Sequence, residues 1–269
     1  MNDRSAGLLA ICRHVFDPDA QSVALHPGHD GTAVLRATTT VGEVTVKRHR
    51  APERHHQEVH AYRHWTPALR DRAPQLLAVS DDPPAIVVTA LPGRPFADCR
   101  LDAGREAEAH RQAGQLLRML HHAAPPRSEP DMTAWLADRG EQWLTLAKTI
   151  LPARRRAEIR EHLRALATLG PVSAVPCHLD YTPRNLLLGG TDRQVAVIDF
   201  EHARYDLAAR DLVRLATRTW PARPDLEAAF LDGYGLLTAL DKQIIEHCAH
   251  LDALTAAARA AGLGPFLGR

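Results

Sequence analysis

The stretch His178-Leu179-Asp180-Tyr181-Thr182-Pro183-Arg184-Asn185-Leu186-Leu187-Leu188 places an aspartate five residues before an asparagine and then runs into three leucines. Pro183 interrupts the segment and pushes the preceding residue toward extended geometry, so one helix cannot carry both polar groups. Both therefore belong to a loop held between short strands, which is where catalytic groups tend to sit. A second segment, Val195 to Ile198, is an apolar, strand-like run that leads to the carboxylate of Asp199.

These residue types suit phosphoryl transfer from a nucleotide. The reaction needs a carboxylate to orient the attacking hydroxyl, Mg²⁺ held against the phosphates, and a cation that anchors the phosphate tail. Asp180 suits the first role, while Asn185 and Asp199 offer the hard oxygen ligands that Mg²⁺ prefers. Taken alone, such an Asp and Asn are ordinary turn residues that hydrogen-bond their own backbone. The neighbouring His-x-Asp, Leu-Leu-Leu and Ile-Asp-Phe-Glu patterns favour the functional interpretation.

At these residues the chain resembles a known family. Residues 178–185 resemble the catalytic loop of the aminoglycoside phosphotransferase and choline kinase group, which shares the protein kinase fold. Residues 198–201, Ile-Asp-Phe-Glu, resemble that group's metal-binding strand end, where protein kinases have Asp-Phe-Gly. Two departures are Leu179, where a small residue is usual, and Thr182-Pro183, where His-Pro is common. Neither departure falls on a metal or base position.

The resemblance implies a bilobal α+β protein kinase-like fold, with an antiparallel sheet plus a helix in the N-terminal lobe and a mostly helical C-terminal lobe. We expect the nucleotide-binding lobe in residues 1–91, and the catalytic loop and substrate site in residues 92–269. By the same resemblance Asp180 is the catalytic base, and Asn185 and Asp199 are the magnesium ligands.

The N-terminal third alternates like a sheet. We expect a helix over residues 6–16, a helix over residues 53–65, and strands over residues 22–25, 33–40, 43–47, 75–79 and 85–89. Lys47 ends one of these strands and resembles the kinase-fold lysine that pairs with nucleotide phosphates. A strand-end lysine facing solvent is the ordinary alternative. Glu58 favours the phosphate-binding interpretation. It follows Lys47 by eleven residues, in the expected helix, and its carboxylate can reach back to orient the ammonium.

Two backbone segments gain a role only from the resemblance. Residues 90–95 match the hinge between lobes, where the C=O of Ala90 and the N–H of Leu91 are the expected adenine contacts, since Pro92 has no N–H. The loop over residues 26–32 has two glycines and matches the segment that covers the phosphates. Its Pro-Gly and Asp-Gly pairs are equally ordinary hairpin residues.

From residue 102 onward the apolar period changes from 2 to 3.6, which predicts helices over residues 104–123, 132–150, 152–170 and 207–218 and two more within 224–261. Asp211 resembles the family's acid that braces the catalytic loop from below. The candidate substrate contacts are Glu201 and Asp206, and Asp206 is equally suited to a turn.

Composition excludes several classes. A net charge of +1 gives no electrostatic case for nucleic acid or a membrane surface as partner. No apolar run approaches the roughly 20 residues of a membrane span. We expect a reducing cytoplasm, because four separated cysteines without Cys-x-x-Cys indicate neither a disulfide framework nor a zinc site. Most of the sixteen histidines, for example His55-His56 and His121-His122, are expected at the surface.

The leading hypothesis is a small-molecule kinase that uses ATP or GTP with Mg²⁺ to phosphorylate a hydroxyl of an antibiotic or related metabolite, as a monomer or homodimer. The charge-balanced C-terminal half argues against a polycationic aminoglycoside and favours a less charged antibiotic, such as a nucleoside or a peptide. One alternative is a non-catalytic nucleotide binder, which has no need of a base. Another is a metal-dependent hydrolase, whose metal ligands would be His178, Asp180, Asp199 and His202. That hypothesis gives no role to Lys47 and Glu58.

Overall fold

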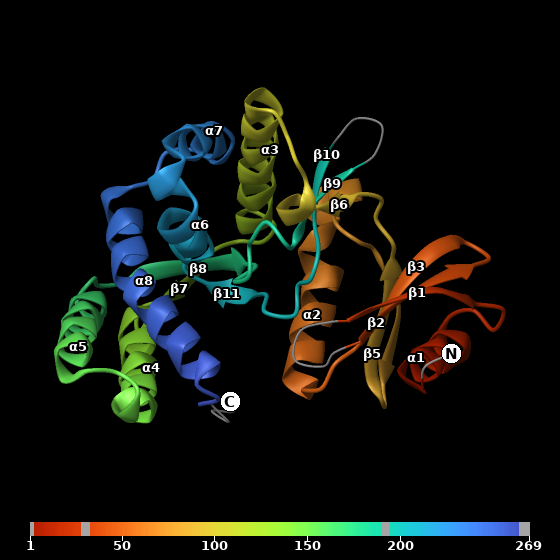
Figure 1. Cartoon of the computed structure of the whole chain (residues 1–269), viewed down its shortest axis with the longest axis horizontal. Coiled ribbons are helices and arrows are strands. Elements are labelled where there is room, and N and C mark those ends of the chain that lie inside the picture. Colours follow the sequence, from red (N-terminus) through yellow and green to blue (C-terminus); the bar gives the residue numbers. More distant parts are fainter. Residues whose placement is uncertain (1–2, 28–32, 190–193, 264–269) are drawn as a thin grey trace.

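The structure is a computed structural model that describes residues 3–27, 33–189 and 194–263. It is mixed α+β, with an antiparallel sheet at the N-terminal end and a mainly helical C-terminal part, as predicted (Figure 1). The glycine loop predicted to cover the phosphates, residues 26–32, lies mostly outside the described residues.

The N-terminal sheet has the strand order β1-β2-β3-β5-β4, with every neighbouring pair antiparallel. Its strands are β1 (Gln21–Pro27), β2 (Ala33–Thr39), β3 (Gly42–Arg48), β4 (Leu76–Asp81) and β5 (Pro84–Thr89). Side chains alternate along a strand, so Val44 and Val46 of β3 face one way and Lys47 faces the other. The two valines pack in a core cluster with Leu8 and Leu9 of helix α1 (Asp3–Val15). Lys47 therefore faces the opposite side, toward α2.

Helix α2 (Pro52–His64) covers that opposite side. Its apolar residues Val59 and Tyr62 join Ile86 and Val88 of β5 in the largest core cluster, which also takes in side chains of the C-terminal lobe. The same helix therefore touches both lobes and can carry Glu58 toward the space between them.

The helices of the C-terminal part fall where the 3.6-residue period predicts them. They are α3 (Ala103–His121), α4 (Met132–Leu146), α5 (Ala153–Ala167), α6 (Val213–Arg218), α7 (Pro224–Tyr234) and α8 (Ala239–Ala260). The predicted helix over residues 207–218 divides into a 3₁₀ segment, η5 (Ala208–Leu212), and α6. Among the described helices, none combines the length and apolar character that crossing a bilayer requires.

Two small sheets support the loops between these helices. One has the order β10-β9-β6, from Gln194–Val197, Leu186–Gly189 and Arg94–Pro95. The other has the order β11-β8-β7, from Arg204–Asp206, Val172–Cys177 and Arg127–Glu129. The sequence predicts neither β7 nor β11, because three residues are too few to show a period.

The segment that joins the lobes lies directly on β9. Gly93 has φ of 126°, and a Cβ added to Gly189 would lie 2.2 Å from the Cα of Gly93. Only two glycines allow backbones to approach this closely. The linker is therefore fixed beside the strand that follows the loop of residues 178–185, while the predicted lobe boundary after residue 91 stays a prediction.

Helices α3 and α7 also approach through two glycines. A Cβ at Gly114 would lie 2.1 Å from the carbonyl oxygen of Phe230, and one at Gly233 would lie 1.9 Å from that of Arg111. Both distances are far below van der Waals contact, so the separation of the two helices depends on the missing side chains.

We expect Gly233→Ala to lower the free energy of unfolding by about 1–3 kcal/mol, because the added methyl group must push α7 away from α3. Gly7→Ala in α1 is the matched control, since nothing lies within 4 Å of the added carbon. It should raise the free energy of unfolding by about 0.5–1 kcal/mol through helix propensity alone. Urea denaturation measures both, and equal effects at the two glycines would contradict the packing argument.

Candidate active site

The loop between β8 and β9 brings Asp180 and Asn185 together. The side-chain amide of Asn185 donates to Oδ2 of Asp180 at 2.8 Å and to its backbone oxygen at 3.0 Å. The aspartate side chain is 24% exposed and therefore reachable from outside, whereas Asn185 is nearly buried. The structure thus joins two residues that the sequence assigns to one site.

Asp211 holds the start of this loop. Its carboxylate accepts hydrogen bonds from the backbone N–H of His178 at 2.8 Å and of Leu179 at 2.5 Å. Leu179 has φ of 61°, a left-handed conformation that costs a non-glycine residue about 1 kcal/mol or more. The two bonds to a buried carboxylate offset this cost, so the predicted bracing role of Asp211 is confirmed.

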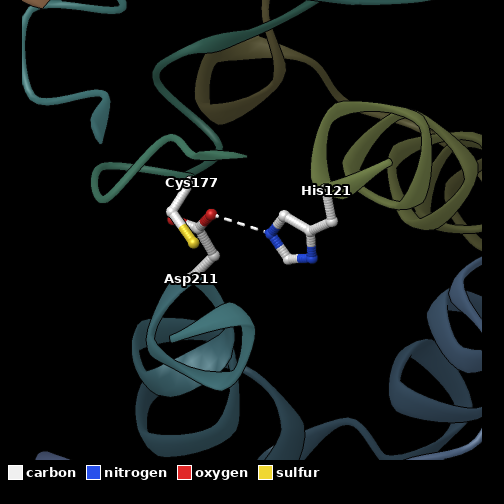
Figure 2. Close-up of side chains that lie close together, drawn as sticks. All are labelled: His121, Cys177 and Asp211. Carbon is white, nitrogen blue, oxygen red and sulfur yellow. Dashed lines mark hydrogen bonds and ion pairs between the residues drawn. The ribbon is translucent and has the colours of Figure 1, made fainter. Parts of the chain in front are cut away.

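Asp211 is itself held by residues from distant elements (Figure 2). His121, at the end of α3, places Nε2 3.0 Å from the Asp211 carboxylate and Nδ1 2.9 Å from the hydroxyl of Tyr234 in α7. His121 is only 5% exposed, and His55 is also buried against the carbonyl of Ala85, so the expectation that these two histidines lie at the surface is wrong.

Cys177 completes the cluster in Figure 2, but the three side chains do not form a metal centre. His121, Cys177 and Asp211 lie within metal-ligand distance of one another. Each is already used: the Cys177 thiol donates to the backbone oxygen of Asp206 at 3.3 Å. Burial raises the pKa of Cys177 well above its ordinary value, so it stays a thiol rather than the metal-binding thiolate.

The second loop, after β10, is bonded directly to the first. Nε2 of His178 donates to the carbonyl of Ile198 at 3.0 Å, and the N–H of Ile198 donates to the carbonyl of Asn185 at 3.0 Å. Asp199 follows with φ of 69°, another left-handed non-glycine residue. Such conformations persist where the surrounding structure dictates them, and they concentrate at functional sites.

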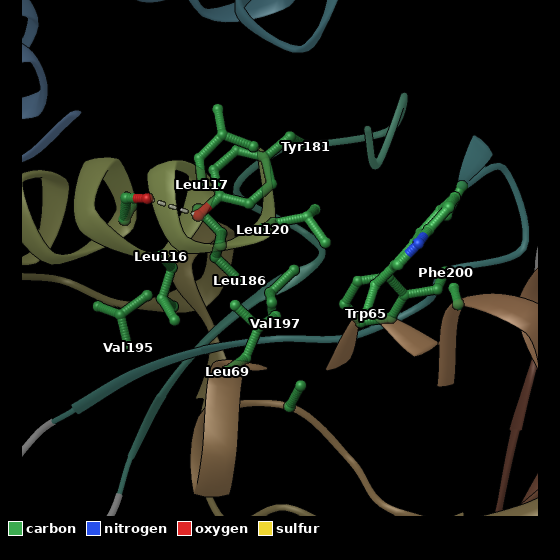
Figure 3. Close-up of a cluster of buried hydrophobic side chains, with 14 of the residues drawn as sticks. Trp65, Leu69, Leu116, Leu117, Leu120, Tyr181, Leu186, Val195, Val197 and Phe200 are labelled. Atoms are coloured by element: carbon green, nitrogen blue, oxygen red, sulfur yellow. Dashed lines mark hydrogen bonds between the residues drawn. The ribbon is translucent and has the colours of Figure 1, made fainter. Parts of the chain in front are cut away.

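An aromatic residue anchors each loop in the core (Figure 3). Tyr181 follows Asp180, is 1% exposed, and donates its hydroxyl to the carbonyl of Ala113 at 2.7 Å. Phe200 follows Asp199 and is fully buried in the same cluster. Each aspartate is therefore adjacent to a fixed ring, which limits where its carboxylate can point.

Lys47 lies among three carboxylates. Its Nζ is 2.9 Å from Glu58, 2.5 Å from Asp199 and 2.8 Å from Glu201. The predicted Lys47–Glu58 pair is therefore present. Burial lowers the pKa of Lys47, but the carboxylates outweigh it and hold that pKa well above its ordinary value, so the ammonium stays charged.

This cluster leaves room for a hard cation. Three carboxylates around one ammonium carry an excess of two negative charges, with Lys47 and Glu58 buried and with Asp199 and Glu201 partly open to solvent. Burial raises the pKa of Asp199, but Lys47 more than offsets this and keeps it below its ordinary value. Within the described residues, no hydrogen bond engages Oδ2 of Asp199 or Oδ1 of Asn185. These two oxygens suit a divalent cation such as Mg²⁺.

A profile of the phosphotransferase enzyme family matches residues 23–247, which is well over half of the chain. The chain belongs to this family. The prediction of a phosphotransferase from the loops around Asp180 and Asp199 is thereby confirmed. A search of curated protein sequences finds no match to this phosphotransferase.

Solved structures share its fold over nearly the whole chain. Macrolide 2′-phosphotransferase MphH from Brachybacterium faecium is 20% identical, with a TM-score of 0.65, over 97% of this chain and 94% of that one. Aminoglycoside-3′-phosphotransferase of type VIII is 21% identical, with a TM-score of 0.62, over 94% and 100%. Choline kinase LicA from Streptococcus pneumoniae is 15% identical, with a TM-score of 0.61, over 91% and 88%. The kinase-like bilobal fold that the sequence predicts is confirmed.

The segment predicted to bind adenine has one of its groups already used. The N–H of Ala90 donates to the carbonyl of Glu43 at 3.0 Å. Among the described residues, no turn, loop or cap hydrogen bond to another backbone group uses the carbonyl of Ala90 or the N–H of Leu91. Both groups are therefore compatible with the predicted adenine contacts, which stay a prediction.

The two candidate substrate contacts differ in their surroundings. Glu201 is 23% exposed and pairs with Lys47, so it lies at the same centre. Asp206 is fully buried and pairs with Arg204 at 3.0 Å and Arg210 at 2.5 Å. The substrate-contact prediction for Asp206 is corrected: no surface of its carboxylate is left for a ligand, and its role is structural.

The hydrolase alternative requires four ligands that the structure does not gather. Neither His178 nor His202 belongs to any cluster of potential metal ligands found among the described residues. Both ring nitrogens of His178 are engaged, since Nδ1 accepts from the N–H of Asp180 and Nε2 donates to the Ile198 carbonyl. This alternative is therefore not supported.

Two residues of the site escape sequence reasoning. His49 places Nε2 2.5 Å from the Glu58 carboxylate that also holds Lys47. Arg214 of α6 forms an ion pair with Asp180, and its Nε lies 3.4 Å from Asp252 of α8. Spacing was the available signal, since His49 follows Lys47 by two residues and lies one position past the end of β3, and Arg214 follows Asp211 by three residues.

We expect Asp206→Asn to lower the free energy of unfolding by about 2–4 kcal/mol, because it leaves two arginines without a buried counter-charge. Burial raises the pKa of Asp206, but Arg210 and Arg204 outweigh it and keep that pKa below its ordinary value of 3.8. The stabilisation is therefore present above that value and is lost as the pH falls toward the folded pKa.

Urea denaturation at neutral and acidic pH measures this effect. Asp225→Asn is the matched control, since Asp225 pairs with Arg223 at 2.7 Å but is 53% exposed. An exposed pair contributes about 0–1 kcal/mol. A loss at Asp206 no larger than at Asp225 would contradict the structural role.

Proposed function

We propose that this phosphotransferase moves the γ-phosphate of ATP to a hydroxyl group of a small molecule, an antibiotic or a related metabolite. The observation that carries the proposal is that the loop bearing Asp180 is hydrogen-bonded to the loop bearing Asp199, and Asp199 pairs with Lys47 of β3. The two groups of residues linked in this way are Lys47 with its carboxylates and Asp180 with Asn185. A cation for phosphates, oxygens for a metal and a carboxylate for a hydroxyl are the parts that this reaction needs.

Lys47 is the proposed phosphate anchor. Its ammonium is held from α2 by Glu58 and from the second loop by Asp199. When the nucleotide binds, its α and β phosphates replace some of the carboxylates that contact the Lys47 ammonium. Glu58 remains as the partner that keeps the ammonium in place, because His49 and the N–H of Phe200 fix its carboxylate at 2.5 and 3.2 Å.

Asp180 is the proposed base. A substrate hydroxyl gives its proton to the Asp180 carboxylate while its oxygen attacks the γ-phosphorus, and the bond from that phosphorus to the β-phosphate oxygen breaks. Asn185 contacts one carboxylate oxygen of Asp180 and Arg214 contacts the other, so the carboxylate is oriented before the substrate arrives. Orientation of this kind is a large part of catalysis in phosphoryl transfer.

Mg²⁺ is the proposed metal, and Asn185 and Asp199 are the residues that would hold it. When bound, it supplies neutralisation of the negative charge on the transferring phosphoryl group. The excess negative charge around Lys47 is what a divalent cation would balance.

The charges near Asp180 bear on the class of substrate. Asp180, Arg214, Asp252 and Arg218 alternate in sign along one chain of ion pairs. This chain of ion pairs contains as many arginines as carboxylates, so it offers a polycationic aminoglycoside no net negative charge. We therefore propose a less charged hydroxylated antibiotic, such as a nucleoside or a peptide, with ATP used in the cytoplasm and the enzyme acting as a monomer or homodimer.

The first test is mass spectrometry of a panel of hydroxylated antibiotics incubated with the enzyme, Mg²⁺ and ATP. The panel includes aminoglycosides, nucleosides and cyclic peptides. We expect a gain of about 80 Da on one compound. Asp180→Asn should lower its turnover at least about a hundredfold, because the base is lost, while ATP affinity is kept.

Asp19→Asn, an exposed aspartate of the N-terminal lobe, is the control and should turn over normally. Near-wild-type turnover by Asp180→Asn would remove the base from the proposal. Nucleotide binding without any phosphorylated product across the panel would favour the non-catalytic binder.

Arg214→Ala should lower kcat by about tenfold or more with little change in KM for ATP, because a charge-assisted bond that orients Asp180 is lost. Arg214→Lys should recover part of the rate. Arg218→Ala is the control, since Arg218 pairs with Asp252 but not with Asp180. An equal loss of kcat in both alanine variants would mean that Arg214 acts only through Asp252.

A further inference from the structure

A cluster of histidines that the proposed reaction does not use lies where α5 packs on α8. In Figure 1 these two helices lie side by side in the C-terminal lobe, at the far side from the N-terminal sheet. His162 comes from α5, and Glu246, His247 and His250 come from α8. No residue proposed for phosphoryl transfer belongs to this group.

The helices fix the positions of these side chains. Ile159 and Leu163 of α5 pack with Cys248 and Leu251 of α8 in one buried cluster. His162 precedes Leu163, and His247 precedes Cys248, so both histidines border this packed seam. Residues three and four apart share a helix face, which brings His250 beside both Glu246 and His247. Ligands on packed helices are held more firmly than ligands on loops.

The distances match those of a metal site. Nδ1 of His162 lies 3.1 Å from Nδ1 of His247, and the ligand atoms of His162, Glu246 and His247 all lie within 4.8 Å of one another. A tetrahedral zinc ion with bonds of about 2.0–2.1 Å to nitrogen separates its ligand atoms by roughly 3.3–3.4 Å. The two imidazole nitrogens, which share a hydrogen bond with each other, are already near that separation, and the carboxylate of Glu246 is exposed and free to turn toward them.

His250 adds two observations. Its ring stacks on that of His162, with centroids 3.6 Å apart and planes at 12°, which fixes the orientation of His162. Its own Nδ1 is buried and has no hydrogen-bond partner. His250 is not one of the three residues whose ligand atoms lie within 4.8 Å of one another, so this nitrogen is an unsatisfied polar atom beside the cluster and not a ligand.

The donor set indicates which ion the site would take. Two imidazoles with one carboxylate suit borderline ions such as Zn²⁺ rather than Mg²⁺ or Ca²⁺, which prefer oxygen alone.

We propose that His162, Glu246 and His247 bind one divalent transition-metal ion, zinc by preference, which clamps α5 to α8. The site is independent of the Mg²⁺ proposed for Asn185 and Asp199, because it uses different helices and softer ligands. Its bound ion stabilises the packing of the C-terminal lobe and takes no part in phosphoryl transfer.

The test is a titration of the chelator-treated full-length protein, prepared without a histidine tag, with Co²⁺ as a coloured substitute for Zn²⁺. We expect one equivalent of Co²⁺ to bind. The bound ion should show a visible absorption band stronger than that of the hydrated, octahedral ion. His162→Gln and His247→Gln should each weaken binding by at least about tenfold, because each removes one ligand. Circular dichroism establishes that both variants are folded.

His14→Gln, which alters an exposed histidine of α1, is the matched control and should bind as the wild type does. Zn²⁺ should raise the unfolding temperature of the wild type and of this control, but not of the other two variants. Binding in the carboxylate centre around Asp199 would not respond to either substitution. The proposal is overturned if the wild type binds no Co²⁺, or if both glutamine variants bind it as tightly as the wild type.

Discussion

The buried carboxylate of Asp211 is the constraint on which the rest of the site depends. It accepts two backbone hydrogen bonds from the loop that carries Asp180, and it pairs with His121. His121 in turn contacts Tyr234, so one carboxylate connects the loop with α3 and α7. Because Leu179 holds a left-handed conformation, the loop needs such an anchor. The close contact of α3 with α7 through Gly114 and Gly233 fixes the position of His121, which in turn orients the Asp211 carboxylate.

A second constraint links the two lobes through charge. Lys47 belongs to the N-terminal sheet, whereas Asp199 and Glu201 belong to the loop after β10. Glu58 of α2 joins them through the same ammonium and through the backbone N–H of Phe200. The buried Lys47–Glu58 pair is costly to break singly, so it offers a fixed ammonium to the partly exposed carboxylates of the other lobe. In the reaction proposed above, nucleotide phosphates and a cation exchange with these same charges.

Local pattern was enough for the parts of the fold that repeat along the chain. Alternation predicted the strands β3 and β5 to within about one residue at each end, and the 3.6-residue period predicted the long helices. It could not reveal β7 and β11, whose three residues are paired only by tertiary contact with β8. Composition likewise predicted that His55 and His121 lie at the surface, because histidine is polar. The buried groups that they bond, the Ala85 carbonyl and the Asp211 carboxylate, are known only from the structure.

The sequence by itself determined the family and the fold class, through the resemblance of residues 178–185 and 198–201 to known motifs. It also singled out as candidates for the site Lys47, Glu58, Asp180, Asn185 and Asp199, because motifs of this kind depend on spacing along the chain. Only the tertiary structure decided what surrounds them. It buried Asp206 between two arginines, brought Arg214 to Asp180 and His49 to Glu58, and gathered His162 with His247 across two helices. The physical reason is that burial and pairing depend on residues far apart in sequence, such as the 85 positions between His162 and His247, and no local period records them.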